Sequence, residues 1–205
     1  RLHRSAQSPA GRAIVTRYND GAVNWASVGR VAPNKCCEDI LKAFAYYQRL
    51  IAPHSRLFLV GGIKHFEAYQ FNLARLSEHW QLRDVHWLDR VDDADGFGAY
   101  YALASVLVEM SAHEGFCAPL LEAMSFDVPI IAYAAAAVPE TLGNAGVQIT
   151  AKRPDTLAGL VEALQHDGLL RSRIITTQRE RLAAFATERV LAQLRAALMQ
   201  LTQGA

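Results

Sequence analysis

The chain has little cysteine, almost no net charge and no long apolar run, and each of these absences excludes a class of protein. Its 205 residues contain three cysteines, which form no disulfide framework and favour a reducing compartment. A formal net charge of +1 excludes a strong field for nucleic acid or for an anionic membrane. The longest apolar stretch, Val128 to Val138, falls far short of the roughly 20 residues that cross a bilayer. The composition, 51% hydrophobic and 20% charged, is that of an ordinary globular protein.

Several chemical motifs are missing as well. The sequence has no H-E-x-x-H and no C-x-x-C, so we expect no metal site. No G-x-G-x-x-G follows the first predicted strand, where the chain reads V-G-R-V-A-P, which argues against a dehydrogenase-type dinucleotide domain.

The chain starts without an initiator Met, and its first eleven residues, RLHRSAQSPAG, are polar and basic without apolar periodicity. Residues 1–20 are therefore predicted to form a linker or lead-in from a preceding domain, with a short strand at Ala13 to Thr16. The folded domain is expected over residues 21–205, and the chain is expected to be a piece of a longer protein.

Short apolar runs alternate with segments of helical periodicity along the rest of the chain. Strands are predicted at Asn24 to Val31, Arg56 to Val60, Val85 to Leu88, Val106 to Met110, Val128 to Tyr133 and Gly146 to Thr150. This alternation implies repeated right-handed crossovers. The predicted fold is therefore α/β: a Rossmann-like, doubly wound parallel sheet of about six strands, with helices on both faces.

Ligands of such sheets bind beyond the carboxyl ends of the strands. The loops after the first four strands should therefore meet along one rim: Arg30 to Cys37, Gly61 to Lys64, Asp89 to Asp92 and Ser111 to Ala118.

The central feature of this rim is the stretch SAHEGFCAPLLEAMSFD, from Ser111 to Asp127. It predicts a turn that enters a helix, whose free N–H groups form an anion site. Glu114 and Glu122 flank the turn in the spacing E-x(7)-E, and carboxylates accept hydroxyls but repel phosphate. The pattern favours a nucleotide-sugar site. Each acid taken alone is equally explained as a residue of a helix start or an exposed helix face.

Arg30 and Lys35 follow the first strand and suit a diphosphate, the arginine as a bidentate donor and the lysine as a point charge. Read singly they are as well explained as solvated loop charges. His113 is better explained as a locally bonded side chain. Cys117 could have a lowered pKa at a helix start, but with no base nearby in the sequence it is more simply a small space-filler.

Five segments, in this order, closely resemble the C-terminal domain of family-4 retaining glycosyltransferases with the GT-B fold: VGRVAPNK, LFLVGG, DVHWLDRV, YYALASVLVEMSAHEGFCAPLLEAM and VPIIAYAAAAVPETLGNAGV. The resemblance covers roughly Asn24 to Ala205, and its most specific part is EGF-x-x-P-x-L-E-A-M. It implies one half of a two-domain enzyme, the half that binds a nucleoside-diphosphate sugar.

The resemblance also implies roles for individual residues. Arg30 and Lys35 would hold the donor diphosphate beside Gly29, Glu114 would bind the transferred sugar, and Glu122 the ribose. Further contacts are expected from the backbone of Gly115, Phe116, Cys117 and Ala118 and from the stretch Arg90–Val91. Catalysis is expected from Glu114, Arg30 and Lys35, without metal or cofactor.

The expected reaction transfers a sugar to an acceptor hydroxyl with retention of configuration, in bacterial polysaccharide, lipopolysaccharide or glycolipid synthesis. The acceptor, a glycan or glycolipid, would be bound through a missing N-terminal domain, on which the two C-terminal helical segments would partly pack. An exposed apolar face is therefore expected on them. No nucleic-acid partner is expected, and the setting is the cytoplasm, with peripheral association at the inner face of the plasma membrane.

Three departures from the family pattern stand out: Cys36 and Cys117 replace usual glycines, and Ser105 replaces a usual aspartate. Two alternatives stay open, a non-catalytic nucleotide-binding module of the same fold and a nucleotide-sugar epimerase.

Overall fold

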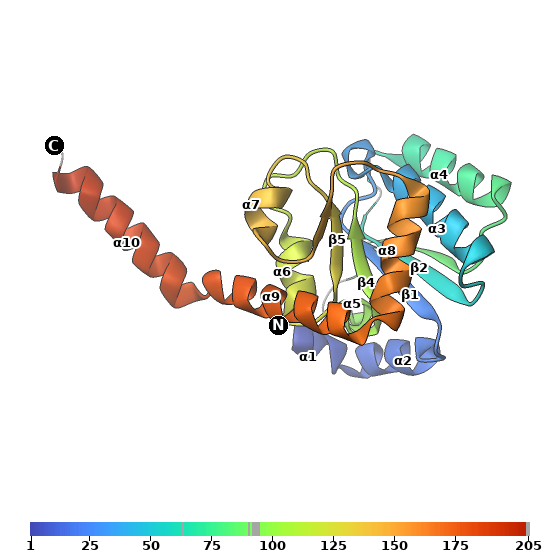
Figure 1. The fold of residues 1–205 in the computed structure, drawn as a ribbon, viewed down its shortest axis with the longest axis horizontal. Coiled ribbons are helices and arrows are strands. Elements are labelled where there is room, and N and C mark those ends of the chain that lie inside the picture. The colour runs from blue at the N-terminus through green and yellow to red at the C-terminus, as the bar shows by residue number, and fades with distance from the viewer. Residues whose placement is uncertain (63, 90, 92–94, 204–205) are drawn as a thin grey trace.

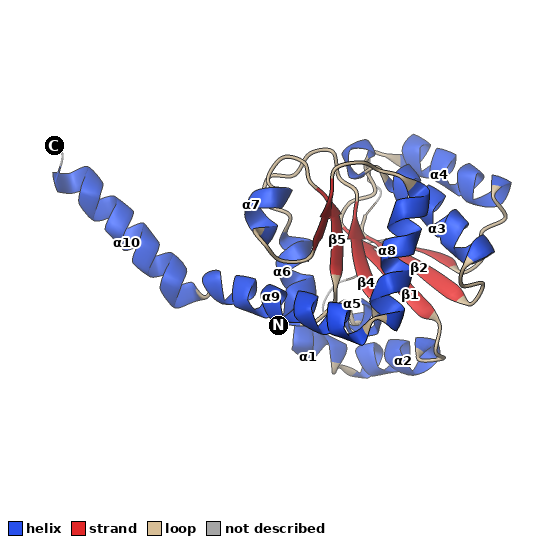
Figure 2. Cartoon of the chain, viewed as in Figure 1, coloured by secondary structure: helices blue, strands red, loops and turns tan. Residues whose placement is uncertain are grey.

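The computed structural model describes residues 1–62, 64–89, 91 and 95–203. Six strands form one parallel sheet in the order β3-β2-β1-β4-β5-β6, with helices on both faces (Figures 1 and 2). The strands are β1 (Val23–Val28), β2 (Ser55–Val60), β3 (Val85–Leu88), β4 (Val106–Glu109), β5 (Ile130–Tyr133) and β6 (Val147–Ile149). The predicted fold class is confirmed.

The helices follow the predicted alternation from β1 onward. They are α3 (Cys37–Leu50), α4 (Glu67–His79), α5 (Gly98–Leu103), α6 (Ala118–Ser125), α7 (Val138–Leu142), α8 (Pro154–His166), α9 (Gly168–Ala184) and α10 (Thr187–Gln203), with a 3₁₀ turn η1 (Pro33–Lys35) before α3. The strand order reverses between β1 and β4: β2 and β3 follow on one side of β1, and β4, β5 and β6 follow on the other.

Two apolar clusters cover the two faces of the sheet. On one face, Trp25 of β1 packs against Phe44 and Tyr47 of α3. On the other face, Phe58 of β2 belongs to a cluster with Tyr101 of α5 and Leu120 of α6. Because β1, β2 and β4 lie in the middle of the sheet and are covered on both faces, their residues are buried almost without interruption rather than at alternate positions.

The register of the sheet brings the carboxyl ends of the central strands together. Val28, the last residue of β1, pairs with Val60, the last residue of β2, which pairs with Leu88 at the end of β3. The loops that follow these strands therefore begin at the same edge.

The prediction of an irregular lead-in with a strand at Ala13 to Thr16 was wrong. Two helices occupy this region, α1 (Leu2–Ala6) and α2 (Pro9–Tyr18), and both pack against α5. Ser8 caps α2 by accepting a hydrogen bond from the N–H of Gly11 at 3.0 Å, and Pro9 lies in its first turn.

This packing has a weak apolar signature because it relies on small residues. A Cβ at Gly98 would lie 2.1 Å from the carbonyl oxygen of Leu2, and a Cβ at Gly96 would lie 2.7 Å from the backbone nitrogen of Gly11. Backbone therefore meets backbone in this contact, and few large side chains are needed.

At the other end of the chain, α10 projects away from the body of the domain (Figure 1). Five apolar side chains on it are exposed: Val190, Leu191, Leu194, Leu198 and Met199. The predicted exposed apolar face is confirmed on this helix. In the described part of the chain, no helix combines the length and apolar character needed to span a membrane.

Candidate functional site

The loop after β1 and the loop after β4 are joined by hydrogen bonds through Asn34. The N–H of Ala112 donates to the carbonyl of Asn34 at 2.8 Å. The side-chain amide of Asn34 in turn donates to the carbonyl of His113 at 3.2 Å. The two loops thus form one connected surface.

Lys35 and Glu114 meet on this surface. The Nζ of Lys35 lies 2.7 Å from a carboxylate oxygen of Glu114, and both side chains are largely buried, with exposed fractions of 14% and 12%. The topology argument from the sequence placed these two loops on one rim, and the structure brings these two side chains into direct contact.

A third charged group, Glu109, lies beneath this pair and was missed by the sequence analysis. Glu109 is the last residue of β4 and is 1% exposed. One of its carboxylate oxygens accepts the N–H of Val28 at 3.1 Å, and the other lies 3.9 Å from the Nζ of Lys35. A carboxylate inside an otherwise apolar central strand needs such partners, and this is the sequence signal that could have revealed it.

The charges in this cluster shift one another's pKa values. Burial raises the pKa of Glu109 to about 7, against the opposing pull of the Lys35 ammonium and the Val28 hydrogen bond. Burial acts to lower the pKa of Lys35, but Glu109 and Glu114 outweigh it, so the pKa of Lys35 is raised. The lysine therefore stays charged at neutral pH.

Gly29 makes room for the lysine side chain. Its φ is +142°, and a Cβ there would lie 2.7 Å from the Nζ of Lys35. Gly61, the residue after β2, lies directly against Gly29, because a Cβ on Gly61 would be 2.1 Å from the carbonyl oxygen of Gly29. Glycine at both positions allows the chain ends of β1 and β2 and the lysine to pack at this edge.

The turn from β4 into α6 presents backbone N–H groups. In the described residues, the N–H groups of Phe116, Cys117 and Ala118 donate to no protein acceptor, as is usual before and at a helix start. A Cβ added to Gly115 would meet no heavy atom within 4 Å, so this glycine faces open space. Pro119 lies in the first turn of α6, as predicted.

Glu122 lies one turn further along α6 and is half-buried. Its carboxylate accepts a hydrogen bond from the hydroxyl of the buried Tyr101 of α5, a partner that the sequence did not reveal. The Glu122 charge contributes to the raised pKa of Glu109, so the two acids belong to one electrostatic neighbourhood.

The remaining predicted residues make other contacts. Arg30 is exposed, and its guanidinium lies 5.5 Å from the centre of the Phe66 ring. Val91 is partly buried against the cluster of α5 and α6. Arg90 lies outside the described residues.

Cys36 and Cys117, which replace glycines of the resembled family, both adopt backbone conformations that favour glycine. Their φ values are +50° and +62°. Burial, followed by the charges of Glu109 and Glu114, raises the pKa of the Cys117 thiol, so the helix start does not activate it. The space-filling interpretation of Cys117 agrees with its 4% exposure.

Glu109, Glu114 and Cys117 place potential metal-ligand atoms within 4.8 Å of one another. The Lys35 ammonium, however, already lies against both carboxylates and supplies the cation that this donor set would attract. The residues therefore fit an ammonium-centred cluster better than a metal site.

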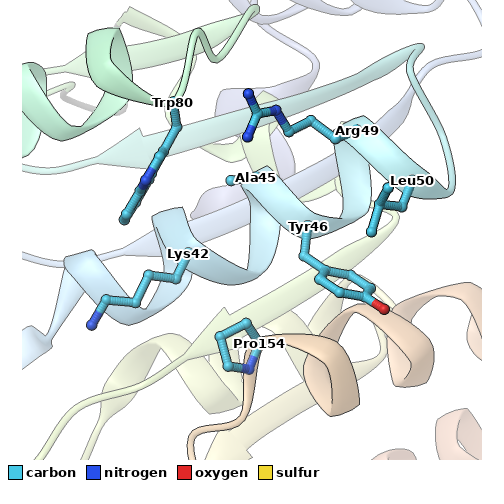
Figure 3. A pocket seen from close by; sticks show the side chains of 7 residues that line it. All are labelled: Lys42, Ala45, Tyr46, Arg49, Leu50, Trp80 and Pro154. Atoms are coloured by element: carbon cyan, nitrogen blue, oxygen red, sulfur yellow. The ribbon is translucent and has the colours of Figure 1, made fainter.

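The apolar depressions of the surface lie elsewhere. One of about 300 Å³ lies on the outer side of α3, between Trp80 at the end of α4 and Pro154 at the start of α8 (Figure 3). A small cavity of about 10 Å³ lies directly under the candidate site, lined in part by Gly29, Arg30 and Lys35.

Comparison with known proteins places the chain in a family. The family glycosyl transferases group 1 matches residues 17–181. O-antigen chain mannosyltransferase B of Escherichia coli is 29% identical over 147 residues, which cover 68% of this chain and 36% of that protein. The chain thus spans little more than a third of this curated relative.

Solved structures show the same fold. The C-terminal domain of a group 1 glycosyl transferase (LpcC) from Francisella tularensis has a TM-score of 0.70 and 20% identity, with 82% of this chain and 90% of that chain covered. Anabaena Alr3699/HepE, solved in complex with UDP-glucose, has a TM-score of 0.75 and 19% identity, with 95% and 53% covered. With the fold and the family match over most of its length, the chain belongs to the glycosyl transferases group 1 and forms a C-terminal GT-B domain.

Proposed function

We propose that this domain binds the nucleoside-diphosphate sugar donor of a retaining glycosyltransferase. The observation that carries the proposal is the contact between Lys35 and Glu114 at the carboxyl edge of the sheet, 2.7 Å apart. The turn that holds Glu114 also carries three backbone N–H groups without an acceptor among the described residues. A cation for phosphate, an acid for hydroxyls and amides for either are the groups that a sugar diphosphate requires.

The donor would share the lysine with the two acids. An ammonium has three N–H donors, and the ion pair with Glu114 at 2.7 Å can occupy only some of them, which leaves others for phosphate oxygens. The N–H groups of Phe116, Cys117 and Ala118 would bind phosphate or sugar oxygens, and the exposed guanidinium of Arg30 would reach the diphosphate from the loop after β1.

The reaction would break the bond between the anomeric carbon and the diphosphate oxygen and form a bond from the same face to an acceptor hydroxyl. The leaving phosphate oxygen would receive the hydroxyl proton. Lys35, Arg30 and the α6 amides would stabilise the charge that develops on the leaving diphosphate. We propose that no metal is required, because the ammonium of Lys35 already fills the role of the cation.

The names of relatives suggest a biological setting. An O-antigen mannosyltransferase is similar in sequence, and a similar structure holds UDP-glucose. We therefore propose a hexosyl donor and a polysaccharide, lipopolysaccharide or glycolipid acceptor, in the bacterial cytoplasm at the inner face of the plasma membrane. A further domain of the enzyme would bind this acceptor.

A thermal-shift panel of UDP, GDP, ADP and their sugars tests the proposal. A ligand at 100 times its dissociation constant adds about 2.7 kcal/mol to the free energy of unfolding, which raises the melting temperature of a chain of this size by about 5–11 °C. Lys35→Met and Glu114→Gln should reduce the shift. Lys42→Met is the matched control, because this lysine of α3 pairs with Asp39 at 3.3 Å away from the candidate contact.

The proposal fails if no nucleotide or nucleotide sugar shifts the transition, or if Lys35→Met responds like the unchanged chain. Glu114→Ala in the whole enzyme separates the proposal from a non-catalytic binding module: we expect transfer to collapse, whereas an unaltered transfer rate would favour the module.

A further inference from the structure

Glu109 is a buried carboxylate to which the proposed donor site assigns no role in binding. It ends β4, between β1 and β5 in the middle of the sheet, and its side chain is 1% exposed. Isolated charge in such a place is strongly unfavourable, so its two contacts, Val28 N–H at 3.1 Å and Lys35 Nζ at 3.9 Å, define what it does.

The cluster has an excess of negative charge. Lys35 lies against two carboxylates, those of Glu109 and Glu114, and a third carboxylate is near on α6. The titratable groups that interact electrostatically with Glu109, from every element packed around it, are Lys35, Cys37, Tyr101, Glu114, Cys117 and Glu122. Lys35 is the one cation among these described groups, and its Nζ lies 2.7 Å from Glu114 but 3.9 Å from Glu109. Of the two acids that share the lysine, Glu109 therefore has the less well compensated charge.

We infer that Glu109 is a positioning residue for Lys35 and that its carboxyl takes up a proton when the donor diphosphate binds. This inference rests on the proposed donor site. An arriving diphosphate adds negative charge beside Lys35 and draws on the same ammonium, which weakens its compensation of Glu109. Protonation of the buried carboxyl then removes the surplus charge while its hydrogen bond to Val28 keeps the side chain in place.

The raised pKa of Glu109, about 7, puts this exchange in the neutral range. With one proton taken up, donor affinity should fall as the pH rises above 7, by at most about tenfold per pH unit. Below pH 7, Glu109 is already mostly protonated before the donor binds, so donor affinity should depend little on pH there.

Glu109→Gln separates a role in proton exchange from a merely structural one. The amide has nearly the same shape and can still accept the Val28 N–H, but it cannot titrate. A structural role would lower affinity equally at every pH. The proposed role predicts an affinity for the donor that no longer depends on pH and that exceeds that of the unchanged chain at pH 8.

Isothermal titration of the 205-residue chain with a nucleotide sugar tests this directly. Its phosphates are diesters that do not titrate near neutrality, so bound protons belong to the protein. Titrations at pH 6, 7 and 8, each in two buffers of different ionisation enthalpy, give the number of protons taken up. We expect uptake near pH 7 in the unchanged chain and in Glu162→Gln, a control on α8, and no uptake in Glu109→Gln.

Binding without proton uptake, or uptake that persists in Glu109→Gln, overturns the inference and leaves the donor site intact. Failure of every nucleotide sugar to bind the unchanged chain overturns the donor site and the inference together. Should Glu109→Gln not fold, proton uptake by the unchanged chain still decides, because its absence refutes the inference.

Discussion

Gly29→Ala is the substitution that most directly tests how the edge of the sheet is built. The glycine has a φ of +142°, a conformation that residues with a side chain rarely adopt. The added Cβ would lie 2.7 Å from the Nζ and 2.8 Å from the Cε of Lys35. Both atoms belong to the end of a flexible side chain, so the lysine must give way, and its 2.7 Å contact with Glu114 must change.

The magnitude has two parts. The unfavourable backbone conformation costs about 1–3 kcal/mol. For a chain of this size that lowers the melting temperature by about 2–12 °C. Loss of one charge-assisted hydrogen bond from Lys35 to a phosphate, worth about 1.5–3 kcal/mol, would weaken donor binding by roughly 10- to 150-fold.

Two other glycines serve as controls in the same assays, urea unfolding and calorimetric titration with a nucleotide sugar. Gly61→Ala brings a Cβ to 2.1 Å from the Gly29 carbonyl oxygen, a backbone atom, so it should destabilise more than Gly29→Ala. Gly115→Ala meets no atom within 4 Å, so its free energy of unfolding should change by less than about 0.5 kcal/mol. Its donor affinity should nevertheless fall, if the ligand lies against this backbone as proposed.

The reasoning is refuted if Gly29→Ala unfolds at the same urea concentration as the unchanged chain and binds the donor equally well. Equal destabilisation by Gly29→Ala and Gly115→Ala would also refute it, because the effect would then not depend on the local geometry.

Three further outcomes are expected. The hydrogen bond from the buried Arg56 lowers the pKa of Asp20 to about 2, so the stability that this pair contributes is present above pH 3.8 and is lost as the pH falls toward 2. The free energy of unfolding of Asp20→Asn, measured in urea, should therefore depend less on pH in this acid range. An unchanged dependence on pH would contradict this. Iodoacetamide should modify the half-buried Cys36 in the folded chain but not Cys37 or Cys117, which are 3% and 4% exposed and whose thiol pKa values are raised by burial. Mass spectrometry before and after unfolding checks this. Labelling of Cys117 at the rate of Cys36 would contradict it. Cys36→Gly should raise the free energy of unfolding by about 0.5–1 kcal/mol, because glycine adopts a positive φ without strain and this gain exceeds its greater loss of conformational entropy on folding. A lower stability in urea would show instead that the contacts of the Cys36 side chain outweigh the backbone strain.

Most of the sheet could be predicted because its strands are buried on both faces and its helices begin with clear turn signals. The predicted strand Val85 to Leu88 coincides with β3, whereas the predicted strand Asn24 to Val31 continues three residues beyond the end of β1 at Val28. The apolar run continues past that point because Val31 is buried beneath the loop, although it lies outside the ladder. Apolar character reports burial, and strand pairing ends earlier.

The helices at the N-terminus could not be predicted from apolar periodicity, because their closest approaches to α5 and the residues before it are made by glycine and backbone. Ser8 and Pro9 did offer a helix-start signal, a capping residue followed by proline in the first turn. That local signal, rather than the hydrophobic pattern, was the one to follow here.

The residues of the candidate site also fall into those that the sequence could place and those that it could not. That Lys35 and Glu114 share an edge follows from topology, because parallel strands that are neighbours in the sheet end on the same side. Glu109 and Tyr101 could not be placed from that rule, since they lie under the loops rather than in them, and their roles depend on which polar atom each one reaches.

A carboxylate at the end of a buried strand does, however, constrain its surroundings. In the central strand β4, with apolar neighbours on both faces, Glu109 must have a hydrogen-bond donor and a cation within reach. The backbone of β1 provides the donor at Val28, and the loop after β1 brings the cation, Lys35, over the strand ends at the edge of the sheet. Glu109 thus attracts Lys35 to the edge of the sheet, and Lys35 in turn pairs with Glu114. A buried carboxylate, unfavourable by itself, therefore positions the two charged side chains that would contact a ligand.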